Sequence, residues 1–459
     1  MTAVYLAAMI ALMAGAALAA VWRRLGPLAS SLGCVLLVIV GFHAALGGGV
    51  ATIDLGTWLG FGRSTLRVDR LAGLFFVLAG LTGTAVSLAF AELPGSRLLA
   101  ALHSASLALI AVAIGADNGF LFFLAWEGLT VCIYLLASAD RGQPGSLIAG
   151  YFTGGLTKLG GGALLAAFAL LFAHTGSFEL SAWAGALPHL TAATRAVLFV
   201  LFLIVFGTKV GVLPLQGALP VGYGAAPRAG AATLSVALVA GFYGIWRFII
   251  ALLAPAPPWW GDALLVLGAL TAVAGILYAI TQDDLCRFLG FSTVEHTGIA
   301  LLGLGVALLG QANHNSTLAA AGLLAATLHI TAHTLAKALA LLGVDRITQA
   351  TGRRTLDALG GLGGRLRPTS IVLMLSTLTL AAMPPLGGFV SEWFTFEALL
   401  QGFRLHTLLA RLLCALAAAV LALTAGLGVL AFAKLYGFTF LSSPRENLRP
   451  GGEPSRTAV

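Results

Sequence analysis

Charged residues are scarce in this chain of 459 residues: they make up 9% of it, whereas hydrophobic residues make up 59%. A soluble domain carries about 25% charged residues, so this composition excludes an ordinary soluble fold. It predicts an all-α polytopic membrane protein in which nearly the whole chain is one membrane domain. The net charge of +8 does not indicate nucleic acid binding. Its arginines cluster in short loops, as they do at the cytoplasmic ends of membrane spans.

Cysteine is also scarce. The four cysteines are scattered singly, at Cys34, Cys132, Cys286 and Cys414, and no CxxC pair occurs. This spacing argues against iron–sulfur or zinc ligation. No recognisable motif for binding NADH or flavin is present either. We therefore expect no cofactor and no metal in this chain.

Lysine is rarer than arginine by a wide margin. Only four of the 25 basic residues are lysines, and three of them, Lys158, Lys209 and Lys337, lie inside hydrophobic runs. A buried lysine can lose its proton near neutral pH, whereas arginine effectively cannot. An ionisable residue inside a membrane span indicates a functional site. These lysines are therefore predicted to handle protons.

A helix needs about 20 apolar residues to cross a membrane. The sequence predicts thirteen such spans, near residues 3–22, 27–46, 71–91, 97–115, 118–138, 147–173, 194–212, 229–253, 262–281, 287–310, 318–344, 369–401 and 407–434. The basic loop at residues 345–367 is predicted to lie on the cytoplasmic side of the membrane, together with a short polar tail at residues 441–459. We expect the protein to lie in the inner (cytoplasmic) membrane of a cell. Alternating polar and apolar residues between Gly47 and Asp69 predict a short hairpin.

Two of the predicted spans are interrupted by proline. The seventh places Lys209 five residues before Pro214, and the twelfth places Pro384 and Pro385 just before Glu392. Proline breaks a helix, and broken backbone at membrane depth lines a wet cavity or is buried in protein. Matched broken helices are typical of inverted-repeat transporters. We expect two inverted five-helix repeats, about 97–253 and 262–434, within one transmembrane domain of residues 1–440.

Three ionisable residues in these spans, Glu127, Lys158 and Glu392, each have two competing interpretations. Glu127 has no possible partner at i±3 or i±4 in its own helix, so we expect an ion pair with Lys209, either proton-handling or fixed and structural. Lys158 lies near the start of its span and is a weaker candidate, because it could snorkel to the interface. Glu392 either takes part in proton transfer or satisfies backbone donors freed by the proline break.

The eleventh span carries a stripe of titratable residues. His329, His333 and Lys337 are spaced i, i+4, i+8 and therefore line one helical face. This spacing predicts a water-assisted proton relay that leads towards the second proline break. The alternatives are core histidines bonded to carbonyls, or a metal or haem site for which no third ligand is evident. Glu295 and His296 are adjacent, so they face different directions, and they are weaker candidates.

Taken together, these motifs resemble the antiporter-like, proton-translocating membrane subunits of complex I and membrane-bound hydrogenases, over about residues 70–440. The resemblance is carried by FLAWEGLTVCIYLL around Glu127, GTKVGVLPLQGALP around Lys209, LHITAHTLAKALALLG, and MPPLGGFVSEW around Glu392. DLCRFLGFSTVEHTGIALLGLG is most similar to the branch of hydrogenase-4 component B and formate hydrogenlyase subunit 3. Two departures are Cys286 in place of a common lysine and Gly161 in place of an acidic residue of some relatives.

The resemblance implies that the chain conducts protons or Na⁺ as one subunit of a redox-driven complex. Its partners would be the lipid bilayer, other membrane subunits and, through them, a hydrogenase or dehydrogenase arm. Two alternatives of the same class are a subunit of respiratory NADH-quinone oxidoreductase and a subunit of a multisubunit cation/proton antiporter. The alternative of another class is a non-pumping membrane anchor for a soluble redox module.

Overall fold

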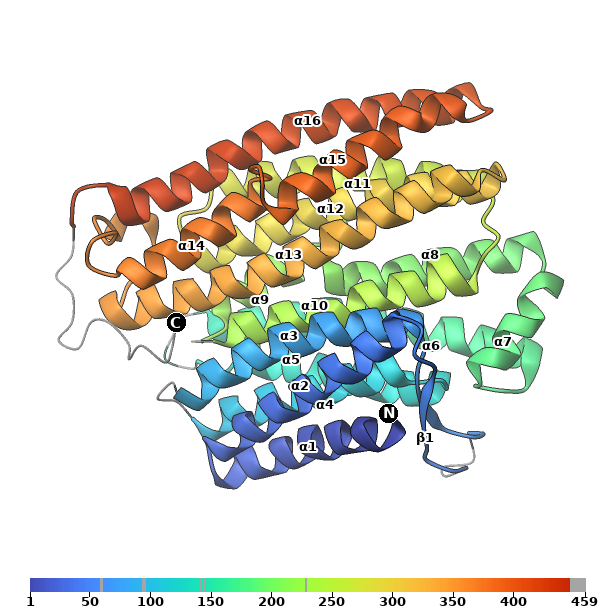
Figure 1. The fold of residues 1–459 in the computed structure, drawn as a ribbon, viewed down its shortest axis with the longest axis horizontal. Helices are drawn as coiled ribbons and strands as arrows, with labels where there is room; N and C mark the ends of the chain where they lie inside the picture. The colour runs from blue at the N-terminus through green and yellow to red at the C-terminus, as the bar shows by residue number, and fades with distance from the viewer. Residues whose placement is uncertain (58–60, 93–95, 141, 143–144, 228, 446–459) are drawn as a thin grey trace. The chain divides into compact units, whose positions relative to one another are not determined.

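The structure is a computed structural model that describes residues 1–57, 61–92, 96–140, 142, 145–227 and 229–445. It divides into two compact units, one formed by residues 1–209 and 225–254 and the other by residues 210–224 and 255–459 (Figure 1). Both units are helical apart from one short hairpin in the first. Most of the predicted tail, residues 446–459, lies outside the described residues, as do the residues at 141 and 143–144 of a predicted loop.

The elements of the first unit are α1 (Thr2–Val21), α2 (Leu25–Ala45), β1 (Ala51–Asp54), β2 (Thr65–Val68), α3 (Arg70–Glu92), α4 (Arg97–Gly115), α5 (Gly119–Ala137), α6 (Ser146–Thr175), α7 (Leu180–Ala186), η2 (Leu187–His189), α8 (Ala192–Val210), α10 (Gly230–Gly244) and the π-helical η3 (Ile245–Leu252).

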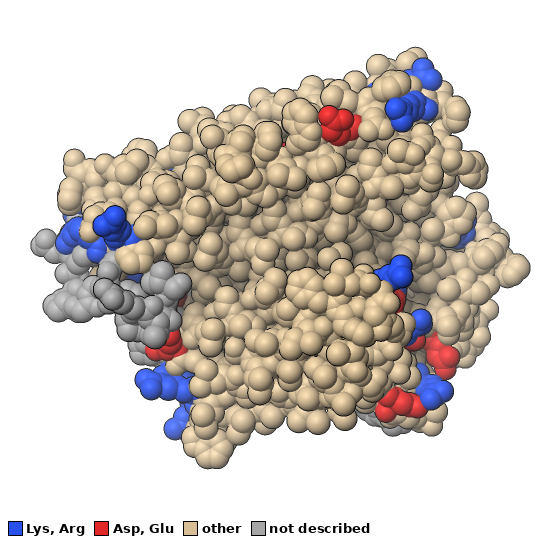
Figure 2. Space-filling model, viewed as in Figure 1, with Lys and Arg blue, Asp and Glu red and all other residues tan. Residues whose placement is uncertain are grey.

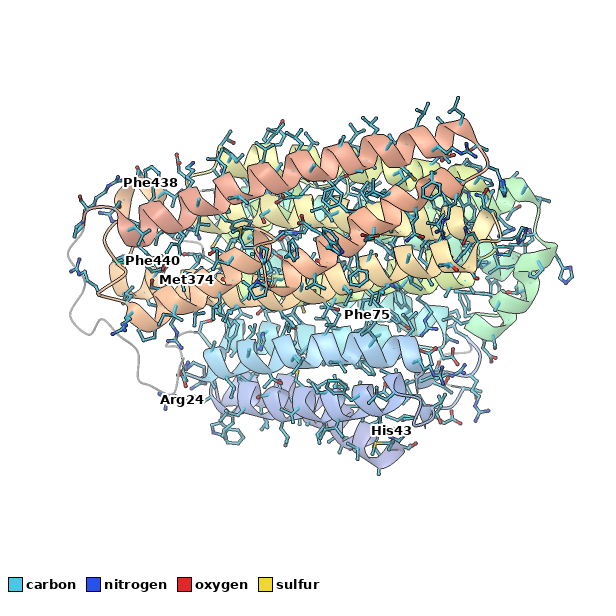
Figure 3. All side chains as sticks on the ribbon, turned by 45° about the horizontal axis from the view of Figure 1, so that its top comes forward. Arg24, His43, Phe75, Met374, Phe438 and Phe440 are labelled. Carbon is cyan, nitrogen blue, oxygen red and sulfur yellow. The ribbon has the colours of Figure 1, made fainter. Side chains whose placement is uncertain are left out.

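Helices α1 to α4 pack side by side, α5 packs between α4 and α6, and α10 packs on α3 and α4. Small residues allow close approach: a Cβ on Gly41 of α2 would lie 2.6 Å from the carbonyl oxygen of Gly73 on α3. Membrane helices associate through such contacts because lipid supplies no hydrophobic drive between them. Phe75 of α3, labelled in Figure 3, is buried with its ring centroid 5.5 Å from that of Tyr243 on α10.

The predicted hairpin is confirmed. Strands β1 and β2 pair antiparallel, with Ala51 opposite Val68 and Asp54 opposite Thr65. Strand β2 also forms a bridge from Leu66 to Ala116, in the short connection between α4 and α5. The hairpin is thereby attached to the connection between α4 and α5, and α5 is the helix that carries Glu127.

The elements of the second unit are α9 (Ala218–Ala225), α11 (Pro258–Ile280), α12 (Leu285–Ala312), α13 (Ser316–Thr351), η4 (Leu356–Ala358), α14 (Arg367–Leu380), α15 (Gly387–Leu400), η5 (Gln401–Arg404), α16 (Leu408–Tyr436) and the π-helical η6 (Gly437–Leu441). Helix α12 packs against α11, α13, α15 and α16. The most apolar stretch of α12 is entirely buried, and this helix forms the centre of the unit.

Among the described residues, twelve helices are long and apolar enough to cross a membrane, compared with the thirteen spans predicted. The difference is the span at 369–401, which is two helices of 14 residues each, α14 and α15. Both predicted breaks are confirmed: Pro214 lies between α8 and α9, and Pro384 and Pro385 lie between α14 and α15. On the face seen in Figure 2, charged side chains gather near the helix ends and the surface between them is uncharged. The inverted relation of the two repeats stays a prediction.

Candidate functional site

Glu127 of α5 forms an ion pair with Lys158 of α6, through Oε2 and Nζ. The prediction that Lys209 is its partner is therefore wrong. Lys158 does not lie near the start of its helix either, because α6 begins twelve residues earlier, at Ser146. One turn further along α6, Gly161 leaves the space that the carboxylate occupies: a Cβ there would lie 2.0 Å from Oε1 of Glu127.

Lys209 lies near the end of α8 and is 3% exposed. Its Nζ lies 4.1 Å from the ring centroid of Trp126, and it donates to Oγ1 of Thr130 at 3.5 Å. A desolvated ammonium over an indole ring is stabilised by about 2 kcal/mol. Trp126 precedes Glu127 in α5 and Thr130 follows it by three residues. Lys209 is thus held against the helix that carries Glu127, without an ion pair between them among the described residues.

Helix α8 ends immediately after Lys209. Gly211 follows with a φ of +87°, a left-handed conformation that glycine adopts without steric cost. A glycine of this kind terminates a helix, and Pro214 then prevents its continuation before α9 begins at Ala218. The chain therefore places a buried ammonium at a helix end inside an apolar segment.

In the second unit, the predicted stripe of α13 is confirmed as one buried face. His329, His333 and Lys337 are exposed by only 2%, 3% and 0%. Nζ of Lys337 donates to the carbonyl of Leu289 at 3.1 Å and to Oγ of Ser292 at 2.8 Å, both on α12. The stripe therefore faces α12.

His296 of α12 completes this face and was undervalued from the sequence. Its Nδ1 lies 3.1 Å from Nε2 of His329, and its ring centroid lies 5.0 Å from that of His333. Ser292 and His296 are spaced i, i+4, which was the signal that could have revealed a second polar face. Glu295 is buried beside it and points elsewhere, since the nearest atom to a Cβ built on Gly428 of α16 is Oε1 of Glu295, at 3.4 Å.

Glu392 lies in the first turns of α15, just after the proline break, and is 5% exposed. It joins the histidines: one ligand atom each from His296, His329 and Glu392 lie within 4.8 Å of one another. The expectation that no third metal ligand lies near the histidines is therefore wrong. Helices α12, α13 and α15, which pack together in this unit, bring the three residues to one place (Figure 1).

The hydrogen bonds fix the tautomers of this cluster. Oγ of Ser391 donates to the carbonyl of Gly388 at 2.8 Å, and a hydroxyl has only one proton to give. It must therefore accept from Nδ1 of His329, which lies 3.0 Å away. Nε2 of a neutral His329 is then an acceptor, so Nδ1 of His296 donates to it. This assignment leaves the lone pair of His296 on Nε2, a buried atom with no hydrogen-bond partner among the described residues.

A cavity of about 220 Å³ lies in the first unit, next to the hairpin. Its two carboxylates lie outside the membrane-spanning helices, because Asp69 precedes α3 and Asp117 follows α4. Asp69 and Asp117 line it together with Arg67 and Arg247. Burial raises the pKa of Asp117 above its ordinary value, although Nη1 of Arg67 lies 3.7 Å from Oδ2. Burial also opposes ionisation of Asp69, but the hydrogen bond and charge of Arg247, at 2.7 Å, outweigh it and hold the pKa of Asp69 below its ordinary value.

A layer of packed aromatic rings extends from Phe248, which follows Arg247 in η3, to Trp126, which contacts Lys209. Five buried side chains form the layer: Phe122, Phe168, Phe202, Phe206 and Phe248. On one side Phe248 directly follows Arg247, which lines the cavity. On the other side the ring of Phe206 packs 5.4 Å from that of Trp126, which contacts Lys209. Lys209 is therefore in contact with one end of this apolar layer, through Trp126.

Comparison with known proteins gives one family over most of the chain. Residues 116–423 match the family described as NADH:quinone oxidoreductase/Mrp antiporter, TM. The chain is 32% identical over 394 residues to hydrogenase-4 component B of Escherichia coli (strain K12), covering 84% of this chain and 58% of that protein. It is 33% identical over 389 residues to formate hydrogenlyase subunit 3 of the same organism, covering 83% of this chain and 62% of that protein.

Solved structures share the fold. A chain of the Mrp complex from Dietzia sp. DQ12-45-1b superposes with a TM-score of 0.79 at 26% identity, over 95% of this chain and 47% of that one. A chain of respiratory complex I from Thermus thermophilus superposes with a TM-score of 0.81 at 22% identity, over 97% of this chain and 90% of that one. The chain spans about 60% of the length of the curated relatives it matches.

Proposed function

We propose, from the premise that this chain belongs to the NADH:quinone oxidoreductase/Mrp antiporter transmembrane family, that it moves protons across a membrane as one subunit of a larger complex. The observation that carries this proposal is the buried cluster of His296, His329 and Glu392, with its 3.1 Å contact between imidazole nitrogens. Ionisable groups are costly inside a membrane, and they are found there where they carry protons or ions.

In the first unit, the carboxylate of Glu127 is paired with Lys158, and Lys209 lies against the same helix. A carboxylate buried in an apolar bundle needs a cation or a proton. When Lys158 neutralises Glu127, Lys209 is free to release its proton. When Lys209 is charged, the carboxylate has a second cation to which it can turn. Glu127, Lys158 and Lys209 therefore form a three-member switch in which the movement of one proton changes the pairing.

In the second unit, Lys337, His333 and His329 are spaced one helical turn apart, about 6 Å along the axis of α13. A single bridging water spans such a gap between donor and acceptor. His296 then connects His329 by a direct hydrogen bond, and Glu392 is the carboxylate next to this pair. Imidazole nitrogens accept protons, whereas hard cations such as Na⁺ prefer oxygen ligands. The transported ion is therefore the proton.

The partners follow from the relatives. Hydrogenase-4 component B and formate hydrogenlyase subunit 3 are each named as one component of an enzyme, and the chain similar in fold from Dietzia is part of a complex. We propose that this chain associates with other membrane subunits in the inner (cytoplasmic) membrane and, through them, with a hydrogenase or dehydrogenase arm. The chain is then the proton-moving part and the electron transfer takes place elsewhere.

The test uses the assembled complex in sealed vesicles, with proton uptake measured during electron transfer. Lys337→Arg keeps the positive charge but cannot release a proton near neutral pH, so we expect it to abolish pumping as completely as Lys337→Met. The matched control is Lys434→Arg. Lys434 lies near the end of α16, where it donates to the carbonyls of Ile280 at 2.8 Å and Gln282 at 3.4 Å and lies 3.6 Å from Oδ1 of Asp283. Arginine can keep these contacts, so pumping should persist.

Electron transfer measured in the same vesicles separates loss of pumping from loss of assembly. If Lys337→Arg pumps at the parental rate, the lysine is only a fixed counter-charge and the relay is refuted. If wild-type vesicles transfer electrons but take up no protons, the chain is a membrane anchor instead.

A further inference from the structure

The cluster where α12, α13 and α15 meet carries a set of atoms that suits a metal ion. We propose that His296, His329 and Glu392 form a binding site for a divalent transition-metal ion, with Zn²⁺ the best fit. These residues come from three separate helices of one unit, and all three are at most 5% exposed.

The spacing of the ligand atoms fits a tetrahedral ion. With Zn–N bonds of about 2.0–2.1 Å, two nitrogens of a tetrahedral site lie about 3.3 Å apart. Nδ1 of His296 and Nε2 of His329 are 3.1 Å apart, so they need to separate by only a few tenths of an ångström. One oxygen of Glu392 lies within 4.8 Å of one ring nitrogen of each histidine, a distance that rotation of the Glu392 side chain can shorten.

The surrounding hydrogen bonds orient the ligands as in known metal sites. A histidine that binds a metal typically donates its other ring N–H to a fixed acceptor. His329 does so, because its Nδ1 donates to Oγ of Ser391, and Ser391 is itself anchored to the carbonyl of Gly388. His296 coordinates after its Nδ1 proton moves to Nε2, the nitrogen that is buried without a partner among the described residues.

The charge of the cluster also favours a cation. Glu295 and Glu392 are both buried, and among the described residues neither forms an ion pair. Lys337 supplies one positive charge nearby, but it is engaged with α12 and lies two turns from His329, about 12 Å along the axis of α13. Carboxylates in an apolar bundle must be protonated or neutralised by a cation. A divalent ion at Glu392 supplies this neutralisation once the carboxyl proton has left.

The donor set selects the kind of metal. Two imidazoles and one carboxylate suit Zn²⁺ and its neighbours, whereas Mg²⁺ and Ca²⁺ need oxygen ligands throughout. Three protein ligands leave a fourth position for a water, and the ring of His333 lies nearby, with its centroid 5.0 Å from that of His296.

The bound ion would stop proton transfer, and this consequence rests on the proposed function. Coordination occupies the lone pairs on Nε2 of His329 and on Nδ1 of His296. These are the two nitrogens between which a proton would pass. Metal binding and proton transfer therefore compete for the same nitrogens. The ion acts as an inhibitor that reads local metal concentration.

The test measures metal binding directly, without any transport. The full chain is purified through a histidine-free tag, and Co²⁺ is added as a spectroscopic stand-in for Zn²⁺. We expect one Co²⁺ per chain with the intense visible bands of tetrahedral coordination, displaced by Zn²⁺ and not by Mg²⁺. His296→Gln and Glu392→Gln should abolish these bands.

Two further variants sharpen the result. Ser391→Ala keeps every ligand but removes the group that orients His329, so it should weaken Co²⁺ binding by about 10–100-fold. His103→Gln changes another fully buried histidine, on α4, that bonds Ser87 and Thr233 and lies in the other unit. Binding should be unchanged in this control.

The site is refuted if the wild type binds no Co²⁺, or if the bands persist in both His296→Gln and Glu392→Gln. Proton pumping is then measured with Zn²⁺ present. If Zn²⁺ binds as described but pumping continues, the metal site stands and the proposed relay through His296 and His329 is wrong. If both hold, inhibition rises in proportion to the fraction of sites filled.

Discussion

The space beside Gly161 gives a sharp prediction about the ion pair of Glu127. A Cβ added at Gly161 would lie 2.0 Å from Oε1 of Glu127, whereas Cβ contacts shorter than 3.0 Å are essentially never seen. The Gly161→Ala substitution therefore requires the carboxylate, the end of a flexible side chain, to move by about 1 Å or more and away from its present position beside Lys158. The adjacent substitution Gly162→Ala meets nothing within 4 Å and serves as the matched control.

The magnitude follows from the exposure of the two partners. Replacing glycine by alanine within a helix gains about 0.5–1 kcal/mol, and both variants share this gain. The side chains of Lys158 and Glu127 are 58% and 19% exposed. Breaking their pair should cost more than the ~0.2–1 kcal/mol of an exposed pair and less than the ~3–5 kcal/mol of a buried one. We expect Gly161→Ala to be less stable than Gly162→Ala by about 1–3 kcal/mol.

The assay compares unfolding of the two purified variants in the same detergent, alongside proton uptake in vesicles. Gly161→Ala should unfold more readily and pump more slowly than Gly162→Ala. Combining Gly161→Ala with Glu127→Asp, which shortens the carboxylate by one methylene, should recover part of both losses. Equal stability and equal pumping of Gly161→Ala and Gly162→Ala would show that the carboxylate does not occupy this space.

Three further outcomes are expected. Phe248→Ala opens the aromatic layer, so it should let protons leak through vesicles at rest and should cost about 3–5 kcal/mol of stability. The control is Phe152→Ala, at a half-exposed residue of α6, which should cause no proton leak. If vesicles that carry Phe248→Ala show no proton leak, the aromatic layer does not act as a barrier to protons. Because Arg247 lowers the pKa of Asp69, the stability that this pair contributes is present above the ordinary Asp pKa and is lost as pH falls through the folded-state pKa. The destabilisation caused by Asp69→Asn, followed by thermal unfolding against pH, should therefore shrink in acid. Because the pKa of Asp117 is raised, its ionisation costs stability as pH rises, so Asp117→Asn should stabilise the protein near neutral pH and lose this advantage below the ordinary Asp pKa.

The membrane helices and the positions of their breaks could be predicted from the amino-acid sequence. Runs of about 20 apolar residues form helices in lipid because every backbone polar group must bond within its own segment. Proline removes a donor wherever it stands, so the breaks at Pro214 and Pro384 were readable as well. The common face of His329, His333 and Lys337 follows from the 3.6-residue period alone.

The pairing of polar groups from different helices could not be predicted from the sequence and depends on how the helices pack. A membrane helix that is apolar on all sides carries no stripe that shows which face turns towards which neighbour. Helix α5 packs on α6, and this contact brings Lys158 to Glu127. Helices α12, α13 and α15 pack together and place His296 beside His329 and Glu392. Such choices depend on how small residues let helices approach, as at Gly161, and that is a property of pairs of helices and not of any one segment.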